Sequence, residues 1–261
     1  MARIPVLCYH RIGGPLELGV TRVARSVFER QMRALAEAGW RTLTLAEYGA
    51  AGAGTGASRS LLLTFDDGYA SLAEEAYPVL AELGLTATTF LITDYIGKTN
   101  AWDVQYTRRR LPHLSWPQVV KWRARGFDFA SHTATHARLT WLDDATARDE
   151  LQRSRRALVG QLGDEAGQAV AYPFGAVDAR VAELARRAGY RLGFGGVRGD
   201  LGDPLLRSRV PTYLWDVGDM PFGLRRDGIG SLGRFVAHVT NRCAVGTTIM
   251  KAVWPYSRMA V

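Results

Sequence analysis

Two adjacent carboxylates, Asp66 and Asp67, stand where the apolar run 61–63 gives way to Gly68. Such a run is typical of a strand buried on both faces, and in parallel α/β folds the residues just past the carboxyl end of a strand line the ligand crevice. Two like charges side by side repel each other and are costly to desolvate unless one binds a cation or a proton. The pair therefore predicts a metal site.

Two histidines, His132 and His136, are candidates for the remaining ligands. They lie four residues apart, directly after the apolar run 127–130. Imidazoles with one carboxylate form a common three-ligand set for catalytic zinc, which leaves a coordination position for water. A His-x-x-x-His pair on its own has a structural role as its alternative. Together with the Asp-Asp-Gly turn, it predicts that one aspartate completes the metal site while its neighbour takes a proton from the bound water.

Short apolar segments alternate with amphipathic ones along the chain, and this pattern predicts a parallel α/β fold. We expect strands at 5–9, 41–43, 60–65, 87–92, 127–130, 170–172 and 191–194. We expect helices at 26–38, 71–83, 115–126, 145–162 and 179–188. A capping box at Ser26 should begin the first helix, and Pro78 should kink or split the second. The sheet is either wrapped into a barrel or left open, and both forms place active sites at the carboxyl ends of the strands.

Composition indicates a single globular domain over residues 1–261. The chain is 47% hydrophobic and 22% charged, and no linker or repeat divides it. Cys8 and Cys243 lie far apart and are predicted to be free thiols. The net charge of +8 would suit an anionic partner, but an arginine-rich solvated surface is the stronger explanation. Because the chain has no nucleic-acid-binding signature, we expect no nucleic acid partner.

The amino-terminal residues predict a cytoplasmic location. They enter a strand-like segment almost at once, without the charged region, apolar stretch and cleavage site of a secretory signal. No uninterrupted apolar run is long enough to cross a bilayer. The expectation holds unless a leader precedes the sequence as given.

Three motifs resemble, in chain order, the first three motifs of the polysaccharide deacetylases, also called NodB-homology proteins or family 4 carbohydrate esterases. They are Thr-Phe-Asp-Asp-Gly-Tyr at 64–69, Ser-His-Thr-Ala-Thr-His at 131–136 and Ala-Tyr-Pro-Phe-Gly at 171–175. The resemblance covers about residues 4–212 and fades over a divergent extension, 213–261. It implies a distorted (β/α)7-type barrel.

The resemblance also implies a role for each motif residue. Asp67, His132 and His136 would bind a divalent metal, for which Zn²⁺ suits the ligand set and Co²⁺, Ni²⁺ or Fe²⁺ are alternatives. Asp66 would be the general base, and metal-bound water would attack the carbonyl of an N-acyl group on a sugar. The backbone amide of Phe174 would help to bind the oxyanion. The implied activity is removal of an N-acetyl or N-formyl group from an amino sugar or glycan.

The catalytic acid departs from the usual family pattern. Most members carry it in a late Leu-x-His motif, but the segment 247–252 contains no histidine. The chain is instead similar to the circularly rearranged branch that includes the biofilm poly-N-acetylglucosamine deacetylases, in which a Tyr-His motif near the amino terminus supplies the acid. That resemblance makes His10, which follows Tyr9, the candidate acid. A capping or core histidine is the alternative.

The third motif shows a second departure, because Ala171 stands where many members have an arginine that orients the catalytic aspartate. Arg209 is a candidate to supply that charge near Asp66, with an ordinary strand-end arginine as the alternative. Tyr172, in the same motif, is a further candidate for a supporting role.

An aromatic residue, Trp102, and the acidic residue after it, Asp103, are candidates for lining a substrate groove, since indole rings stack on sugar faces. Core packing or loop anchoring is the alternative for Trp102. His113 and His238 match no motif, and we expect structural roles for both.

The extension carries four apolar residues at helical spacing among basic ones. They are Leu232, Phe235, Val236 and Val239. A basic amphipathic helix is compatible with peripheral association at the inner face of the membrane, whereas packing on the domain is the alternative. A deacetylase inside the cell would act on a nucleotide-linked or lipid-linked sugar. The rival functions are a deacylase of a non-carbohydrate C–N amide bond and a catalytically inactive glycan-binding protein.

Overall fold

The computed structural model describes residues 4–14, 20–51, 58–102, 110–196, 202–221 and 224. The predictions for Asp103, His238, Cys243 and the amphipathic segment 232–239 lie outside the described residues. Cys8 is a buried free thiol, as predicted. Within the described ranges, no helix combines the length and the apolar character needed to cross a bilayer.

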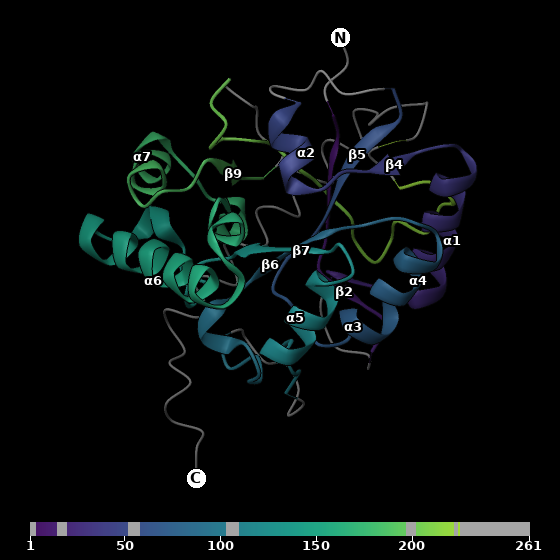
Figure 1. Ribbon diagram of the computed structural model, residues 1–261, viewed down its shortest axis with the longest axis horizontal. Coiled ribbons are helices and arrows are strands. Elements are labelled where there is room, and N and C mark those ends of the chain that lie inside the picture. Colours follow the sequence, from purple (N-terminus) through teal and green to yellow (C-terminus); the bar gives the residue numbers. More distant parts are fainter. Residues whose placement is uncertain are drawn as a thin grey trace.

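The strands form a parallel sheet in the order β10-β1-β5-β6-β7-β8-β9, with β4 beside β5 (Figure 1). Its strands are β1 (Val6–Tyr9), β4 (Arg41–Thr42), β5 (Ser60–Phe65), β6 (Thr88–Leu91), β7 (Asp128–Ser131), β8 (Ala169–Ala171), β9 (Leu192–Phe194) and β10 (Val210–Pro211). A separate parallel pair consists of β2 (Arg11–Ile12) and β3 (Arg22–Val23). Every strand that the sequence predicts is present, within one residue of its expected ends.

The segment that leads into β10 joins the two edges of the sheet. Arg207 exchanges backbone hydrogen bonds with β9, accepting from Gly195 N at 2.8 Å and donating to Gly193 O at 2.9 Å. Three residues later, Val210 pairs with Leu7 of β1. The sheet is therefore wrapped rather than open, and the expectation of a distorted (β/α) barrel is confirmed.

Successive side chains of a strand face opposite sides of this curled sheet. In β5, Leu61 and Leu63 belong to a large cluster on the outer face, whereas Leu62 belongs to an inner cluster with Val6 and Phe90. Residues two and four positions after an inner-facing residue face inward as well. This alternation aims the residues at the carboxyl ends of the strands into the barrel.

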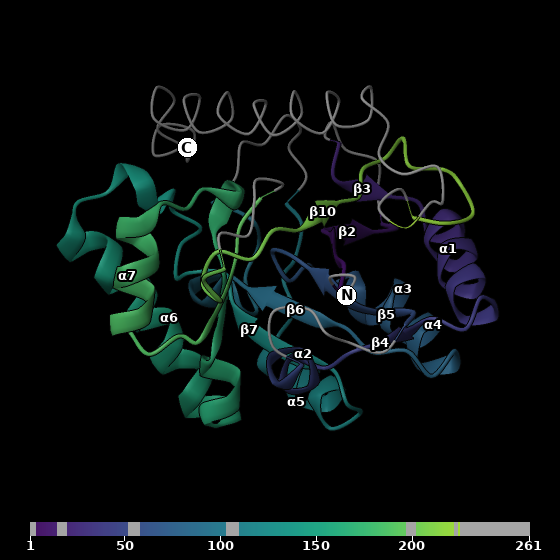
Figure 2. The same ribbon diagram turned by 90° about the horizontal axis from the view of Figure 1, so that it is seen from above.

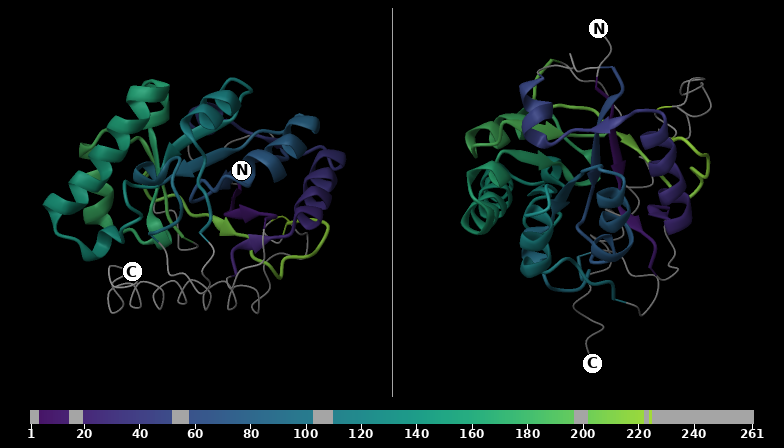
Figure 3. Two further views of the ribbon diagram at one scale, coloured as in Figure 1. Left: turned by 90° about the horizontal axis from the view of Figure 1, so that it is seen from below. Right: turned by 45° about the vertical axis from the view of Figure 1, so that its right-hand side comes forward.

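Helices pack around the sheet, with α6 and α7 at one side and α1 at the other (Figure 2). They are α1 (Arg25–Glu37), α2 (Leu45–Ala50), α3 (Leu72–Glu75), α4 (Tyr77–Glu82), α5 (Trp116–Arg123), α6 (Asp144–Leu162) and α7 (Ala179–Arg187). Four short 3₁₀ turns are η1 (Thr93–Tyr95), η2 (Leu139–Trp141), η3 (Asp164–Gly167) and η4 (Pro173–Gly175). The long helix α6 lies side by side with α7 (Figure 3).

The predicted capping box at Ser26 is wrong. Helix α1 begins at Arg25, and its N-cap is Ala24, which makes no side-chain capping bond. Ser26 is already inside the first turn, where its hydroxyl cannot bond the amide three residues ahead in the capping geometry. The prediction that Pro78 splits the second helix is confirmed, because α3 ends before Ala76 and α4 carries the proline in its first turn.

Helix α2 is not predicted, although its start signal is present in the sequence. Thr44 and Glu47 form a complete capping box. Tyr48 from this helix packs with the inner cluster, its ring centroid 5.7 Å from that of Phe194. The helix thereby contributes an aromatic side chain to the barrel interior.

Candidate active site

The predicted residues converge at the carboxyl ends of four strands of the sheet. Asp66 and Asp67 follow β5, His132 follows β7, Phe174 follows β8 and His10 follows β1. The two aspartates and His132 are each less than 7% exposed. Residues far apart in the sequence therefore form one buried polar site.

Asp67, His132 and His136 have the geometry of a metal-binding set. Oδ1 of Asp67 lies 3.6 Å from Nε2 of His132 and 3.5 Å from Nε2 of His136. In a tetrahedral site with metal–ligand distances of about 2.0–2.2 Å, donor atoms stand roughly 3.4 Å apart. The side chains are thus already spaced for a divalent cation, and a carboxylate with two imidazoles suits Zn²⁺ or its first-row neighbours.

A backbone hydrogen bond fixes the orientation of His132. Its Nδ1 lies 2.8 Å from the carbonyl oxygen of Ala171. Because a carbonyl only accepts, Nδ1 donates and Nε2 keeps its lone pair toward Asp67. Burial lowers the pKa of His132, which favours the neutral imidazole that a metal ligand requires.

Left-handed backbone conformations concentrate in this site. Asp67 (φ 69°), Thr133 (φ 64°), His136 (φ 63°) and Phe174 (φ 61°) have positive φ, and Arg59 is the one other non-glycine residue with positive φ in the described ranges. Such conformations are unfavourable for residues with a side chain and persist where the surrounding structure enforces them. Two of the three residues of the metal-binding set, Asp67 and His136, thus have this unfavourable conformation.

Arg209 forms a bidentate ion pair with Asp66. Its Nη1 lies 2.7 Å from Oδ1 of Asp66, and its Nη2 lies 2.8 Å from Oδ2. Both side chains are buried. Burial alone would raise the pKa of Asp66, but the Arg209 guanidinium, with a smaller contribution from His132, holds that pKa well below its usual range. Asp66 is therefore an oriented anion beside the metal-binding set.

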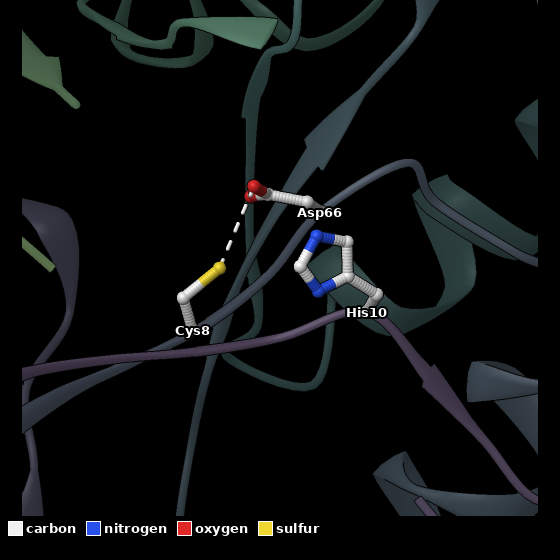
Figure 4. Close-up of side chains that lie close together, drawn as sticks. All are labelled: Cys8, His10 and Asp66. Atoms are coloured by element: carbon white, nitrogen blue, oxygen red, sulfur yellow. Dashed lines mark hydrogen bonds between the residues drawn. The ribbon is translucent and has the colours of Figure 1, made fainter. Parts of the chain in front are cut away.

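Cys8 and His10 lie beside Asp66 on the neighbouring strand (Figure 4). Sγ of Cys8 donates to Oδ2 of Asp66 at 3.5 Å, and the imidazole of His10 faces the same carboxylate. Burial lowers the pKa of His10 to about 4, so its imidazole is neutral at pH 7 in the free site. Burial also raises the pKa of Cys8 far above its usual range, which keeps its thiol protonated as a donor.

A hydrogen-bonded relay that the sequence does not predict supports the metal-binding set. Trp102 Nε1 donates to His113 Nε2 at 2.8 Å, and His113 Nδ1 lies 2.8 Å from the backbone oxygen of Asp67. Since the indole only donates, His113 must accept at Nε2 and carry its proton at Nδ1. His113 has the structural role expected of it, but the group that it holds is a metal-site residue.

Trp102 is 9% exposed, and its ring centroid lies 4.2 Å from that of His136. The structure therefore shows the loop-anchoring alternative for Trp102, packed on a metal-site residue. Its stacking on a sugar stays a prediction.

The third motif brings Phe174 to the site but not Tyr172. The Phe174 ring meets His136 edge-on, with centroids 4.8 Å apart. Tyr172 is buried in an outer cluster with Val181 and Leu184 of α7. Successive residues of a strand face opposite sides, so Tyr172, which follows the inward-facing Ala171, faces away from the site.

Comparison with known proteins identifies the class. The family model described as polysaccharide deacetylase matches residues 53–193, which is more than half of the chain, and the protein belongs to this family. YxkH of Bacillus subtilis strain 168, which is named as a polysaccharide deacetylase, is 29% identical over 194 residues, covering 74% of this chain and 64% of YxkH.

A poly-β-1,6-N-acetyl-D-glucosamine N-deacetylase of Staphylococcus aureus is 25% identical over 175 residues, covering 66% of this chain and 60% of that protein. The matches therefore span less than two thirds of the length of these relatives.

Solved structures confirm the fold as the NodB-type barrel. The Streptococcus pyogenes deacetylase PplD, in complex with acetate, has a TM-score of 0.72 at 24% identity and covers 82% of this chain and 94% of its own. The Bacillus cereus polysaccharide deacetylase BC0361 has a TM-score of 0.68 at 26% identity, with 82% and 66% covered.

Proposed function

We propose that this protein is a metal-dependent hydrolase that removes the N-acetyl or N-formyl group from an amino sugar of a glycan. The observation that carries the proposal is that the adjacent carboxylates of Asp66 and Asp67 lie in different surroundings. Asp67 stands among two histidines at metal-binding spacing, whereas Asp66 is held by Arg209 and kept anionic. One carboxylate for the cation and one for proton transfer is the division of labour that amide hydrolysis needs.

A divalent ion held by Asp67, His132 and His136 would supply positive charge for the acyl oxygen and an activated water. The protein supplies the remaining parts. Asp66 accepts a proton, and Arg209 keeps both of its oxygens aimed. The backbone N–H of Phe174 donates to the negative charge that develops on the acyl oxygen.

His10 donates a proton to the leaving nitrogen. Burial keeps its imidazole neutral in the free site, so it must first gain this proton in the substrate complex. Asp66, whose carboxylate His10 faces, would pass on the proton that it takes from water. Negative charge that develops on the acyl group would favour protonation of the His10 imidazole. The cytoplasmic location stays a prediction.

Acetate or formate release from N-acylated glucosamine oligomers tests the proposal. The purified protein should release the acid, lose this activity in a strong chelator and regain it when Zn²⁺ or Co²⁺ is restored. A parallel panel of linear and cyclic non-carbohydrate amides separates the rival deacylase. Release from the amides alone would contradict the proposal, and glycan binding without any acid release would point to an inactive binding protein.

A further inference from the structure

Arg138 and Trp141 follow the metal-site histidines along the chain, and Arg138 lies over the Phe174 ring, which contacts His136. The Cζ atom of Arg138 lies 5.0 Å from the centroid of the Trp141 ring and 6.0 Å from that of Phe174. The Phe174 ring in turn contacts His136. A guanidinium thus lies one aromatic ring away from a residue of the metal-binding set.

Among the described residues, no carboxylate forms an ion pair with Arg138, and its Nε is buried without a hydrogen-bond partner. The neighbouring cations differ in this respect. Arg209 is paired with Asp66, and Arg180 lies 2.8 Å from Asp144. A partly buried guanidinium without a counter-ion is costly. A ligand that brings negative charge would remove this cost.

The segment that carries both side chains is fixed in place. Leu139 is fully buried, and its carbonyl accepts from Nη2 of Arg180 at 3.1 Å. Trp141 N donates to Arg138 O at 3.0 Å, which closes the turn η2. Trp141 itself is 52% exposed. A rigidly held indole with a free face offers a stacking surface for a sugar ring.

We propose that Arg138 and Trp141 form a subsite for an anionic substrate. Arg138 would bind a carboxylate or phosphate carried on the acylated amino sugar or on its neighbour, since a guanidinium matches both groups through two parallel hydrogen bonds. Trp141 would stack on the adjoining ring. The inference rests on the proposed deacylation of amino sugars and specifies its substrate class.

The test compares anionic and neutral N-acetylated substrates of equal length. Two anionic substrates are used, an amino-sugar oligomer that bears a carboxylate and an amino sugar 1-phosphate. Comparing them shows whether the subsite prefers a carboxylate or a phosphate. In Arg138→Gln, we expect the ratio of kcat/KM for the anionic substrate to that for the neutral one to fall at least about tenfold, mainly through KM. Arg138→Lys keeps the charge and should recover part of this ratio. Trp141→Ala should raise KM for oligomers more than for single sugars.

Arg125→Gln is the matched control, because Arg125 lies over the Trp122 ring at the same 5.0 Å but is exposed at the end of α5. It should leave the ratio unchanged. An equal loss on anionic and neutral substrates in Arg138→Gln, or no loss on either, would overturn the subsite.

Calorimetric binding of the same sugars needs no turnover and keeps the two proposals apart. Tighter binding of the anionic sugar by the unmodified protein, reversed in Arg138→Gln, supports the subsite even if no acid is released. Equal binding of anionic and neutral sugars counts against it.

Discussion

Arg209 holds Asp66 through both carboxylate oxygens, at 2.7 and 2.8 Å, although 142 residues separate the two in the sequence. The resemblance would place an arginine in the third motif, where this chain has Ala171. In the structure the guanidinium beside Asp66 comes instead from the residue just before β10.

Removing the Arg209 charge should move the acidic limb of the activity profile. Arg209 holds the pKa of Asp66 below its usual range, so in Arg209→Met burial is left to raise that pKa. Asp66 would then be protonated, and inactive as a base, at a higher pH than in the unmodified protein. The pH profile of kcat/KM should therefore shift its acidic limb upward.

The same variant should be destabilised by about 3–5 kcal/mol in urea unfolding at pH 7, because it leaves a buried carboxylate without its partner. The pair stabilises the fold above the ordinary aspartate pKa, and this contribution is lost as the pH falls through the lowered one. Arg209→Lys, which keeps a positive charge, should show a smaller shift. Identical pH profiles in all three proteins would contradict the assignment of Asp66 as the base.

Metal content should separate the two aspartates. Asp67→Asn should lose the bound divalent ion together with activity, because its Oδ1 stands between both histidine nitrogens. Asp66→Asn should keep about one ion per chain and still lose turnover by at least roughly a hundredfold. Elemental analysis after desalting, followed by the acetate assay, measures both. Retention of the ion in Asp67→Asn would show that the cation binds elsewhere.

His10→Ala should abolish turnover while leaving the ion at Asp67 in place, because His10 faces Asp66 and lies outside the set of Asp67, His132 and His136. We expect a loss of about 10²–10⁴-fold, the range of general acid catalysis. Cys8→Ala, which removes the other neighbour of Asp66 on β1, is the matched control and should cost far less. Near-normal activity in His10→Ala would remove it as the acid.

The Trp102–His113 relay should affect metal affinity. His113→Phe removes the donor to the backbone oxygen of Asp67 and should weaken the apparent metal affinity by about 10–100-fold, as loss of such supporting bonds does. His113→Asn keeps a donor near the position of Nδ1 and should lose less. Competition against a chromophoric chelator measures both. Equal affinities in the two variants would mean that His113 acts only through packing.

Much of the fold follows from local sequence signals, and the parts that do not depend on contacts between distant segments. Strands such as β5 are predictable because their apolar runs end at turn residues. In contrast, β10 is two residues long and is defined only by pairing with β1. The predicted cap of α1 is wrong because Ser26 satisfies a local sequence preference, whereas the helix begins at Arg25 with Ala24 as its N-cap.

The site divides in the same way. Asp66, Asp67, His132 and His136 stand in motifs and converge because parallel strands end at one edge. His113 has no such signal, since it reaches Asp67 through a loop that pairs with Tyr69 in an isolated antiparallel bridge. That no carboxylate of the described residues pairs with Arg138 likewise depends on the three-dimensional arrangement and cannot be read from the order of residues.

The closing segment has a consequence for the synthesis of this protein. Residues 207–211 both join β9 to β1 and carry the guanidinium that aims the base. A nascent chain that has emerged only as far as β9 already contains Asp66, Asp67, both metal-site histidines and His10, yet its base has no partner. On the proposed function, Asp66 would therefore be oriented and held anionic only after β10 has docked on β1.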